Sequence, residues 1–184
     1  MSLEKRVELL EKLVTELRAE VNAIKGKKQQ ESDNKPWKRN SVGDYMIKVL
    51  YPGILQKQHR ADPKAGFPNN RKLLAQQIKP GQTMIIYSTD PIKKIIGVGE
   101  TTSFMKEVDS QWKYSIDFKW IVPPKHGLTF EEVGLDIRVI VGDTIFSLTP
   151  KKANEIIERL KQQPDLDEST MDYIVSEYER IHKK

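Results

Sequence analysis

Residues 78–103, IKPGQTMIIYSTDPIKKIIGVGETTS, contain the pattern that decides the fold. Two apolar runs lie in this stretch, Thr83 to Tyr87 and Ile95 to Thr101, and Asp90-Pro91 separates them. Turn-forming residues bound each run, which is typical of strands. Two β-rich runs joined by a short polar connection favour an antiparallel pair. The stretch therefore predicts two adjacent strands at the centre of a sheet.

Gly97 and Gly99 alternate with Val98 in the second run, so one face of that strand carries no side chains. Glycine weakens a strand, and it often marks a bulge, a bend or a close approach to the backbone. The spacing favours two interpretations equally. Either the strand bends within a small barrel, or another group lies directly against its bare face.

Strand and helix signals continue on both sides of the central pair. Period-2 alternation predicts strands, and capping residues followed by apolar stripes predict helices. In the helix before the central pair, Leu73, Leu74 and Ile78 are expected to face inward. Gly53 to Pro68 has a loop-like composition with one helical turn. The further predicted elements are strands at 45–50 and 113–122, and helices at 69–78, 128–135, 150–160 and from Ser169 onward.

The order of these motifs resembles the EVE domain, a member of the PUA-like superfamily related to YTH, ASCH and SRA-like domains. The resemblance extends from about Gly43 to Gln163 and implies an α+β fold, a small EVE-type barrel flanked by helices. The matching motifs are Gly66 with Asn69-Asn70-Arg71, Lys79-Pro80-Gly81-Gln82, Met84 to Ser88, Ile96-Gly97-Val98-Gly99-Glu100-Thr101, Trp112 to Val122, Leu128 to Leu135 and Ile145 to Leu160.

This resemblance implies a non-catalytic reader of nucleic acid that holds a flipped, modified base in an aromatic pocket. Such a pocket needs flat rings and a few polar groups for the base edge, and basic residues nearby for the phosphates. By position, the base-binding candidates are Tyr51, Phe67, Asn69, Asn70, Tyr87, Ser88, Thr89, Trp112 and Trp120. The phosphate-binding candidates are Arg60, Lys64, Arg71, Lys93, Lys94, Lys38 and Arg39.

The resemblance favours DNA over RNA as the ligand of this reader. Three alternative functions are also open. They are an RNA-binding module, an oligomeric adaptor for proteins, and a small enzyme acting on a modified nucleoside. The enzyme would use Lys48 and Glu100 as an acid–base pair, as in ASCH amidohydrolases, but the ASCH signature is missing. The segment Lys48-Val49-Leu50-Tyr51-Pro52 also departs from the usual end of the first EVE strand. We therefore expect no enzyme activity, no cofactor and no metal.

The N-terminal residues 3–24 form a heptad seam with Val at a and Leu or Ile at d. In a parallel pair, Arg6 faces Glu11 and Glu20 faces Lys25, and both contacts attract. The pattern predicts self-association as a parallel homodimer, with a trimer or tetramer left open. The alternative is an amphipathic helix that docks on its own domain.

The sequence predicts four segments: a coiled coil at 1–26, a basic flexible linker at 27–42, an EVE/PUA-like domain at 43–164 and a C-terminal amphipathic helix at 165–184. Six basic side chains lie between Lys25 and Ser41 against two acidic ones. Trp37, within the linker, either stacks on a base or anchors to the domain.

Apolar runs are too short for a membrane helix, which needs about 18 residues or more. Cysteine is absent and the three histidines are scattered, which disfavours a zinc site and fits a reducing compartment. The charged N-terminus does not have the pattern of a signal peptide. We therefore expect a cytoplasmic protein that does not span a membrane.

Overall fold

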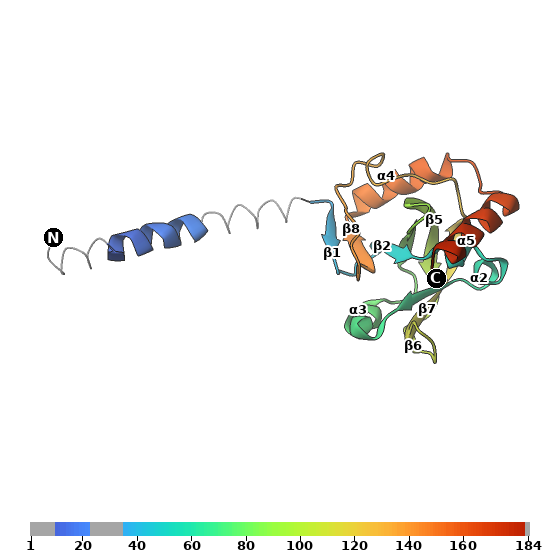
Figure 1. Ribbon diagram of the computed structural model, residues 1–184, viewed down its shortest axis with the longest axis horizontal. Helices are drawn as coiled ribbons and strands as arrows, with labels where there is room; N and C mark the ends of the chain where they lie inside the picture. The colour runs from blue at the N-terminus through green and yellow to red at the C-terminus, as the bar shows by residue number, and fades with distance from the viewer. Residues whose placement is uncertain (1–9, 23–34, 183–184) are drawn as a thin grey trace. The chain divides into compact units, whose positions relative to one another are not determined.

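The computed structural model describes residues 10–22 and 35–182 (Figure 1). The chain divides into two compact units, Met1–Lys35 and Pro36–Lys184. Residues 10–22 are helical, which the heptad pattern predicts. The other heptad positions and most of the expected linker lie outside the described residues.

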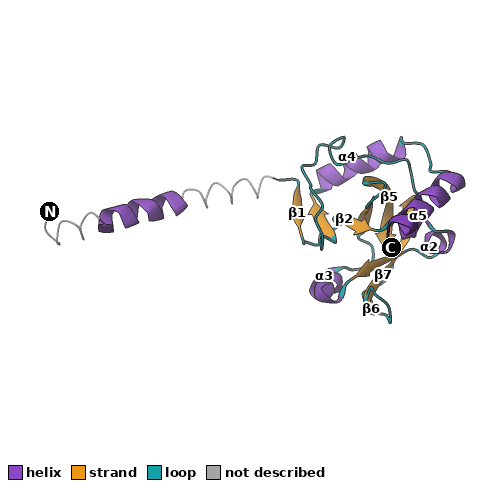
Figure 2. Cartoon of the chain, viewed as in Figure 1, coloured by secondary structure: helices purple, strands orange, loops and turns teal. Residues whose placement is uncertain are grey.

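The second unit is an α+β domain (Figure 2). Its strands are β1 (Trp37–Arg39), β2 (Tyr45–Leu50), β3 (Lys64–Phe67), β4 (Thr83–Ser88), β5 (Lys94–Thr101), β6 (Lys106–Glu107), β7 (Tyr114–Val122) and β8 (Ile145–Leu148). Its α-helices are α2 (Lys57–Ala61), α3 (Lys72–Gln77), α4 (Pro150–Lys161) and α5 (Glu168–His182). Two 3-10 helices, η1 (Pro52–Leu55) and η2 (Asn69–Arg71), complete the described elements.

The strands form one mixed, 8-stranded sheet in the order β1-β8-β2-β4-β5-β7-β3, with β6 paired to β7. The antiparallel pair of β4 and β5 lies near its centre, with Ile85 opposite Val98, and this confirms the sequence prediction. Strand β2 pairs with β4 in parallel. Among the described residues, the pairings run as a path from β1 to β3, and no pairing joins those two strands into the closed barrel that the sequence predicted.

Two hydrophobic cores lie on opposite faces of the sheet. Neighbouring residues of β2 alternate between them, because Met46 belongs to the first core and Ile47 to the second. The first core includes residues of α3, η1 and α5, whereas the second includes the buried stripe of α4. Figure 1 accordingly shows α3 and α4 on opposite sides of the central strands.

The bare face of β5 is covered by aromatic rings from β7. A Cβ atom on Gly97 would lie 2.6 Å from Cζ3 of Trp120, and one on Gly99 would lie closer still to the ring of Phe118. The register also shifts between Val98 and Gly99. The groups that lie against the bare face of β5 are therefore the Trp120 and Phe118 rings. They occupy the space that a side chain at position 97 or 99 would need.

The segment Trp37–Arg39 belongs to the sheet, and this corrects the expected linker at 27–42. It forms β1 and pairs antiparallel with β8, with Lys38 opposite Ser147. The Trp37 ring packs edge-on against Phe146 at 5.8 Å between centroids. The folded domain therefore begins near Pro36 rather than at Gly43, because an aromatic residue within the polar run provides the packing that holds a strand.

Three smaller predictions also differ from the structure. The loop-like stretch before Pro68 contains β3. The stretch at 128–135 forms turns instead of a helix, although Thr129 and Glu132 exchange the two hydrogen bonds of a capping box. Leu73 is exposed, whereas Leu74 and Ile78 pack in the first core as expected. Leu73 and Leu74 are neighbours in the sequence, so on a helix they point about 100° apart and only one of them faces the core.

Candidate functional site

A row of aromatic side chains lies on the surface of the domain. The Tyr51 ring lies 5.4 Å from the Trp112 ring and 5.7 Å from the Tyr178 ring, and Tyr178 lies 4.3 Å from His182. Tyr51 is 44% exposed, while Trp112 and Tyr178 are half-buried. We call Trp112, Tyr51, Tyr178 and His182 the aromatic row. Burial in a core does not explain these rings, because each keeps part of its surface in solvent.

Local backbone features place the first two rings of the row. Tyr51 directly follows β2 in an extended conformation, and Pro52 begins η1 immediately after it. Trp112 precedes β7, and its backbone amide and carbonyl both bond the Ser110 hydroxyl, at 3.1 and 2.9 Å. Its side chain rests on Gly66 of β3, where a Cβ atom would lie 2.8 Å from the Trp112 Cβ. Any larger residue at position 66 would therefore displace the Trp112 ring.

Helix α5 brings the remaining two rings. The Arg60 guanidinium donates to both carboxylate oxygens of Glu168, at 3.1 and 2.7 Å, and fixes the first turn of the helix on α2. Asp167 caps the helix by accepting from the Thr170 amide at 2.8 Å, and the bonds from Ser169 and Thr170 lower the pKa of its carboxyl. Met171 is buried in the first core. The C-terminal helix is therefore built into the domain.

Several polar side chains are buried on the face of the sheet that carries the first core. Lys48 is 1% exposed, its Nζ lies 4.3 Å from the centroid of the Phe67 ring, and it donates to the Val49 carbonyl at 2.9 Å. Burial lowers the pKa of Lys48 to about 7. In the described part of the chain, the buried Ser88 Oγ and Trp120 Nε1 have no hydrogen-bond partner.

The base-binding candidates fall into separate groups. Tyr51 and Trp112 are brought together in the aromatic row, and Phe67 lies beside Gly66, under Lys48. Asn69 accepts a hydrogen bond from the Tyr114 hydroxyl at 3.1 Å, and Asn70 is exposed next to it.

Tyr87 lies on the other face of the sheet, and this corrects its assignment to one site with Trp112. Its ring is 7% exposed and stacks on Phe130 at 4.4 Å in the second core. The neighbouring Ser88 is fully buried, and the Thr89 amide bonds the Leu50 carbonyl at 3.0 Å in the following turn. Trp120 rests on Gly97 within the domain and contacts Phe118 edge-on at 5.2 Å.

Most basic residues expected at phosphates already have partners within the chain. Arg71 donates to the Gly142 carbonyl at 2.8 Å, Lys38 is exposed and Lys94 is half-buried. A side chain in an ion pair is already neutralised, so it contributes less to binding a polyanion. The ion pairs are Arg60 with Glu168, Lys64 with Asp62, Lys93 with Asp90, and Arg39 with Asp143.

Lys48 and Glu100 have different surroundings. The Glu100 carboxylate pairs with Lys119 at 2.7 Å, while Lys48 contacts Phe67. Lys48 is opposite Ile86 on β4, whereas Glu100 is opposite Thr83, three positions away. The described residues contain no group of three or more His, Cys, Asp or Glu side chains that could hold a metal ion. None of the helices in the described ranges is long and apolar enough to cross a membrane.

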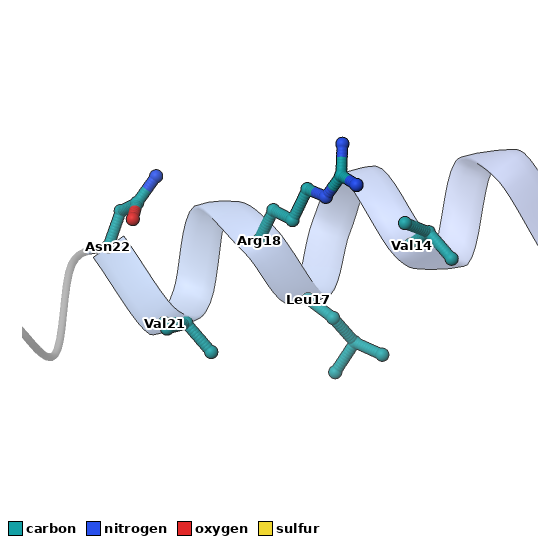
Figure 3. A pocket seen from close by; sticks show the side chains of 5 residues that line it. All are labelled: Val14, Leu17, Arg18, Val21 and Asn22. Carbon is teal, nitrogen blue, oxygen red and sulfur yellow. The ribbon is translucent and has the colours of Figure 1, made fainter.

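The helix of residues 10–22 has an exposed apolar face. Figure 3 shows Leu17 and Val21 projecting from one side of it and Arg18 and Asn22 from the other. The a and d side chains of this helix, from Leu10 to Val21, are between 46% and 60% exposed.

Comparison with known proteins gives a fold but no close relative. No protein-family model and no curated protein matches the chain. The YTH domain of Mmi1, solved in complex with RNA, has a TM-score of 0.51 at 10% identity, covering 70% of this chain and 88% of that one. Protein Atu2648 from Agrobacterium tumefaciens scores 0.46 at 12% identity, covering 67% and 98%. ASCH from Zymomonas mobilis scores 0.45 at 10% identity, covering 67% and 99%. The similarity to the Mmi1 YTH domain shows that the two domains share a fold.

Proposed function

We propose that the domain is a non-catalytic nucleic-acid-binding module that stacks an unpaired base on Tyr51 and Trp112. One observation carries this proposal: two large rings lie 5.4 Å apart on the surface and keep part of their area exposed. Every base has a flat face, so exposed aromatic side chains are the usual platform for single-stranded nucleic acid. A modified base is the ligand that the sequence resemblance implies.

The fold supports this proposal. The ligand is either RNA or DNA, and a different observation favours each. The Mmi1 YTH domain, which has a similar fold, was solved in complex with RNA, and this favours RNA. The resemblance to EVE domains favours DNA, which stays our first expectation. The absence of catalysis is part of the proposal, and the separate partners of Lys48 and Glu100 support it.

Fluorescence anisotropy tests the proposal. The full chain is titrated into single-stranded DNA and RNA of matched sequence, each with plain or methylated bases. Tyr51→Ala and Trp112→Ala, made separately, should each weaken binding by about 5- to 150-fold, since a stacked base contributes about 1–3 kcal/mol. Phe104→Ala is the control, because Phe104 is 64% exposed and lies outside the row.

Two outcomes would refute the proposal. One is that none of the oligonucleotides binds. The other is that Tyr51→Ala and Trp112→Ala both bind as wild type does, while circular dichroism shows both variants folded. A preference for RNA over DNA would correct the expected ligand and keep the site. Release of product from a modified nucleoside would replace the reader with an enzyme.

We also propose that residues 3–24 self-associate as a parallel homodimer. The exposed a and d side chains support this, because a helix of about 12–15 residues is marginal in water without a packing partner. Glu11, at e, would face Arg6 of a second copy. Light scattering should give a dimer for the full chain and a monomer after deletion of Met1 to Lys25. A monomeric full chain would contradict the proposal.

A further inference from the structure

We infer that helix α5 extends the base-stacking site, so that Tyr178 stacks a second base next to the one on Tyr51 and Trp112. This inference rests on the proposed function and assigns a wider ligand to the same site: a single strand with two consecutive unstacked bases. The observation behind it is that the row of rings continues past Tyr51 onto α5.

The spacing of the rings suits a strand whose bases are pulled apart. The centroids of Tyr51 and Tyr178 are 5.7 Å apart, and their planes are inclined by 40°. Bases in a duplex follow one another at about 3.4 Å along each strand. Two bases lying on these two rings therefore cannot remain stacked on each other, which excludes a duplex and favours a single strand.

The position of Tyr178 is set by the packing of α5. Met171 is buried, and Ile174 and Val175 pack against the first core at helical spacing. Tyr178 is one turn further along that face, where the face leaves the core and meets Tyr51. The His182 ring lies 4.3 Å from the Tyr178 ring, and its Nδ1 lies 2.9 Å from the Tyr178 carbonyl oxygen. The ring is thus supported by both neighbours while part of the residue stays accessible.

The charges around Tyr178 predict which part of the ligand α5 contacts. Glu177 pairs with Arg180 at 2.8 Å, and Glu179 accepts from the Gln56 amide at 3.3 Å. The Glu177–Arg180 pair is neutral overall and Glu179 adds a negative charge, so this helix offers a ring to a base and does not hold the backbone. Stacking releases few counterions, and the contribution of Tyr178 should therefore not change with salt concentration.

The experiment compares oligothymidylates and oligoadenylates of one, two, four and about eight nucleotides on the full chain. Tyr178→Ala should leave the affinity for a single nucleotide unchanged and weaken binding of two or more nucleotides by about 5- to 150-fold. That loss should be the same in low and high salt. Tyr178→Phe should restore binding, since it keeps the ring. Tyr173→Ala is the matched control, because Tyr173 is on the same helix and 66% exposed but contacts no other aromatic ring among the described residues.

The outcomes separate this inference from the proposed function. Wild-type binding of the longest oligonucleotide by Tyr178→Ala, with loss by Trp112→Ala, would overturn the inference alone. Equal loss for one nucleotide and for several would also overturn it, because Tyr178 would then serve the first base. If neither substitution changes binding, both proposals fail. Tyr178→Leu, which keeps the bulk against Tyr51 but has no flat face, replaces Tyr178→Ala if the alanine variant is unfolded by circular dichroism.

Discussion

Replacing Lys48 with methionine is expected to stabilise the domain near neutral pH. Lys48 is 1% exposed, and burial lowers its pKa from 10.5 to about 7. Each unit of pKa shift corresponds to about 1.4 kcal/mol, so keeping this lysine charged in the folded protein costs about 5 kcal/mol. The Phe67 ring, 4.3 Å from Nζ, favours the charged form and opposes this effect, but burial dominates. Methionine has a similar shape without the charge, so it should remove the penalty.

The direction in which stability changes with pH follows from the two pKa values of Lys48. The unfolded lysine holds its proton up to about pH 10.5, and the folded one only up to about pH 7. Unfolding therefore takes up a proton between these values, and the stability of the wild type should rise with pH across that window. The advantage of Lys48→Met should be largest below about pH 7 and should shrink by about 3 kcal/mol between about pH 6 and pH 9.

Urea denaturation at several pH values measures this difference. Other titrating groups are common to both proteins, so the difference between the two curves isolates Lys48. Lys119→Met is the control, because Lys119 is exposed on β7 and pairs with Glu100. Parallel curves for wild type and Lys48→Met, or a variant less stable at every pH, would refute the reasoning.

Three further predictions test the contacts described above. Gly99→Ala should lower the stability by about 1–3 kcal/mol because its Cβ would overlap an aromatic ring, while Gly53→Ala, which adds an atom in open space, should leave the melting temperature near wild type. Tyr87→Ala should cost about 3–5 kcal/mol in urea denaturation, and a wild-type value would return that ring to the candidate site. Asp143→Asn should cost about 1–3 kcal/mol by weakening its bond to Arg39, and Arg39→Met in the same protein should add little, since the two side chains form one interaction.

The sequence predicts the long elements well because their signals are local. The run from Tyr45 to Leu50, stopped by Pro52, gives β2 with its observed bounds, and the central pair is found to within one residue at each end. Strands β1 and β3 are missed, because a run of three or four residues is too short to show a periodic arrangement of apolar side chains. Their stability comes from distant partners, such as Phe146 packing on Trp37.

The candidate site is predicted less completely, because it depends on which of the two cores each face of a strand packs against. Alternation shows that Tyr87 and Ser88 face opposite ways, but it does not show which of them faces the second core. Lys48 is missed as a buried residue, although it shares a face with Met46 and Leu50, and that was a usable signal. The role of α5 depends on a fold-level contact that no local pattern encodes.

The place of β1 in the sheet decides where a working fragment of this protein must begin. A fragment cut at Gly43, where the family resemblance begins, would remove the strand that covers β8. The Ile145 carbonyl, which accepts from the Asn40 amide, and the Thr149 amide, which donates to the Pro36 carbonyl, would then lose their partners, and the Phe146 ring would lose its aromatic cover. An uncovered edge strand of this kind can pair with a strand of another molecule. The shorter fragment should therefore aggregate under conditions in which a fragment starting at Lys35 stays in solution.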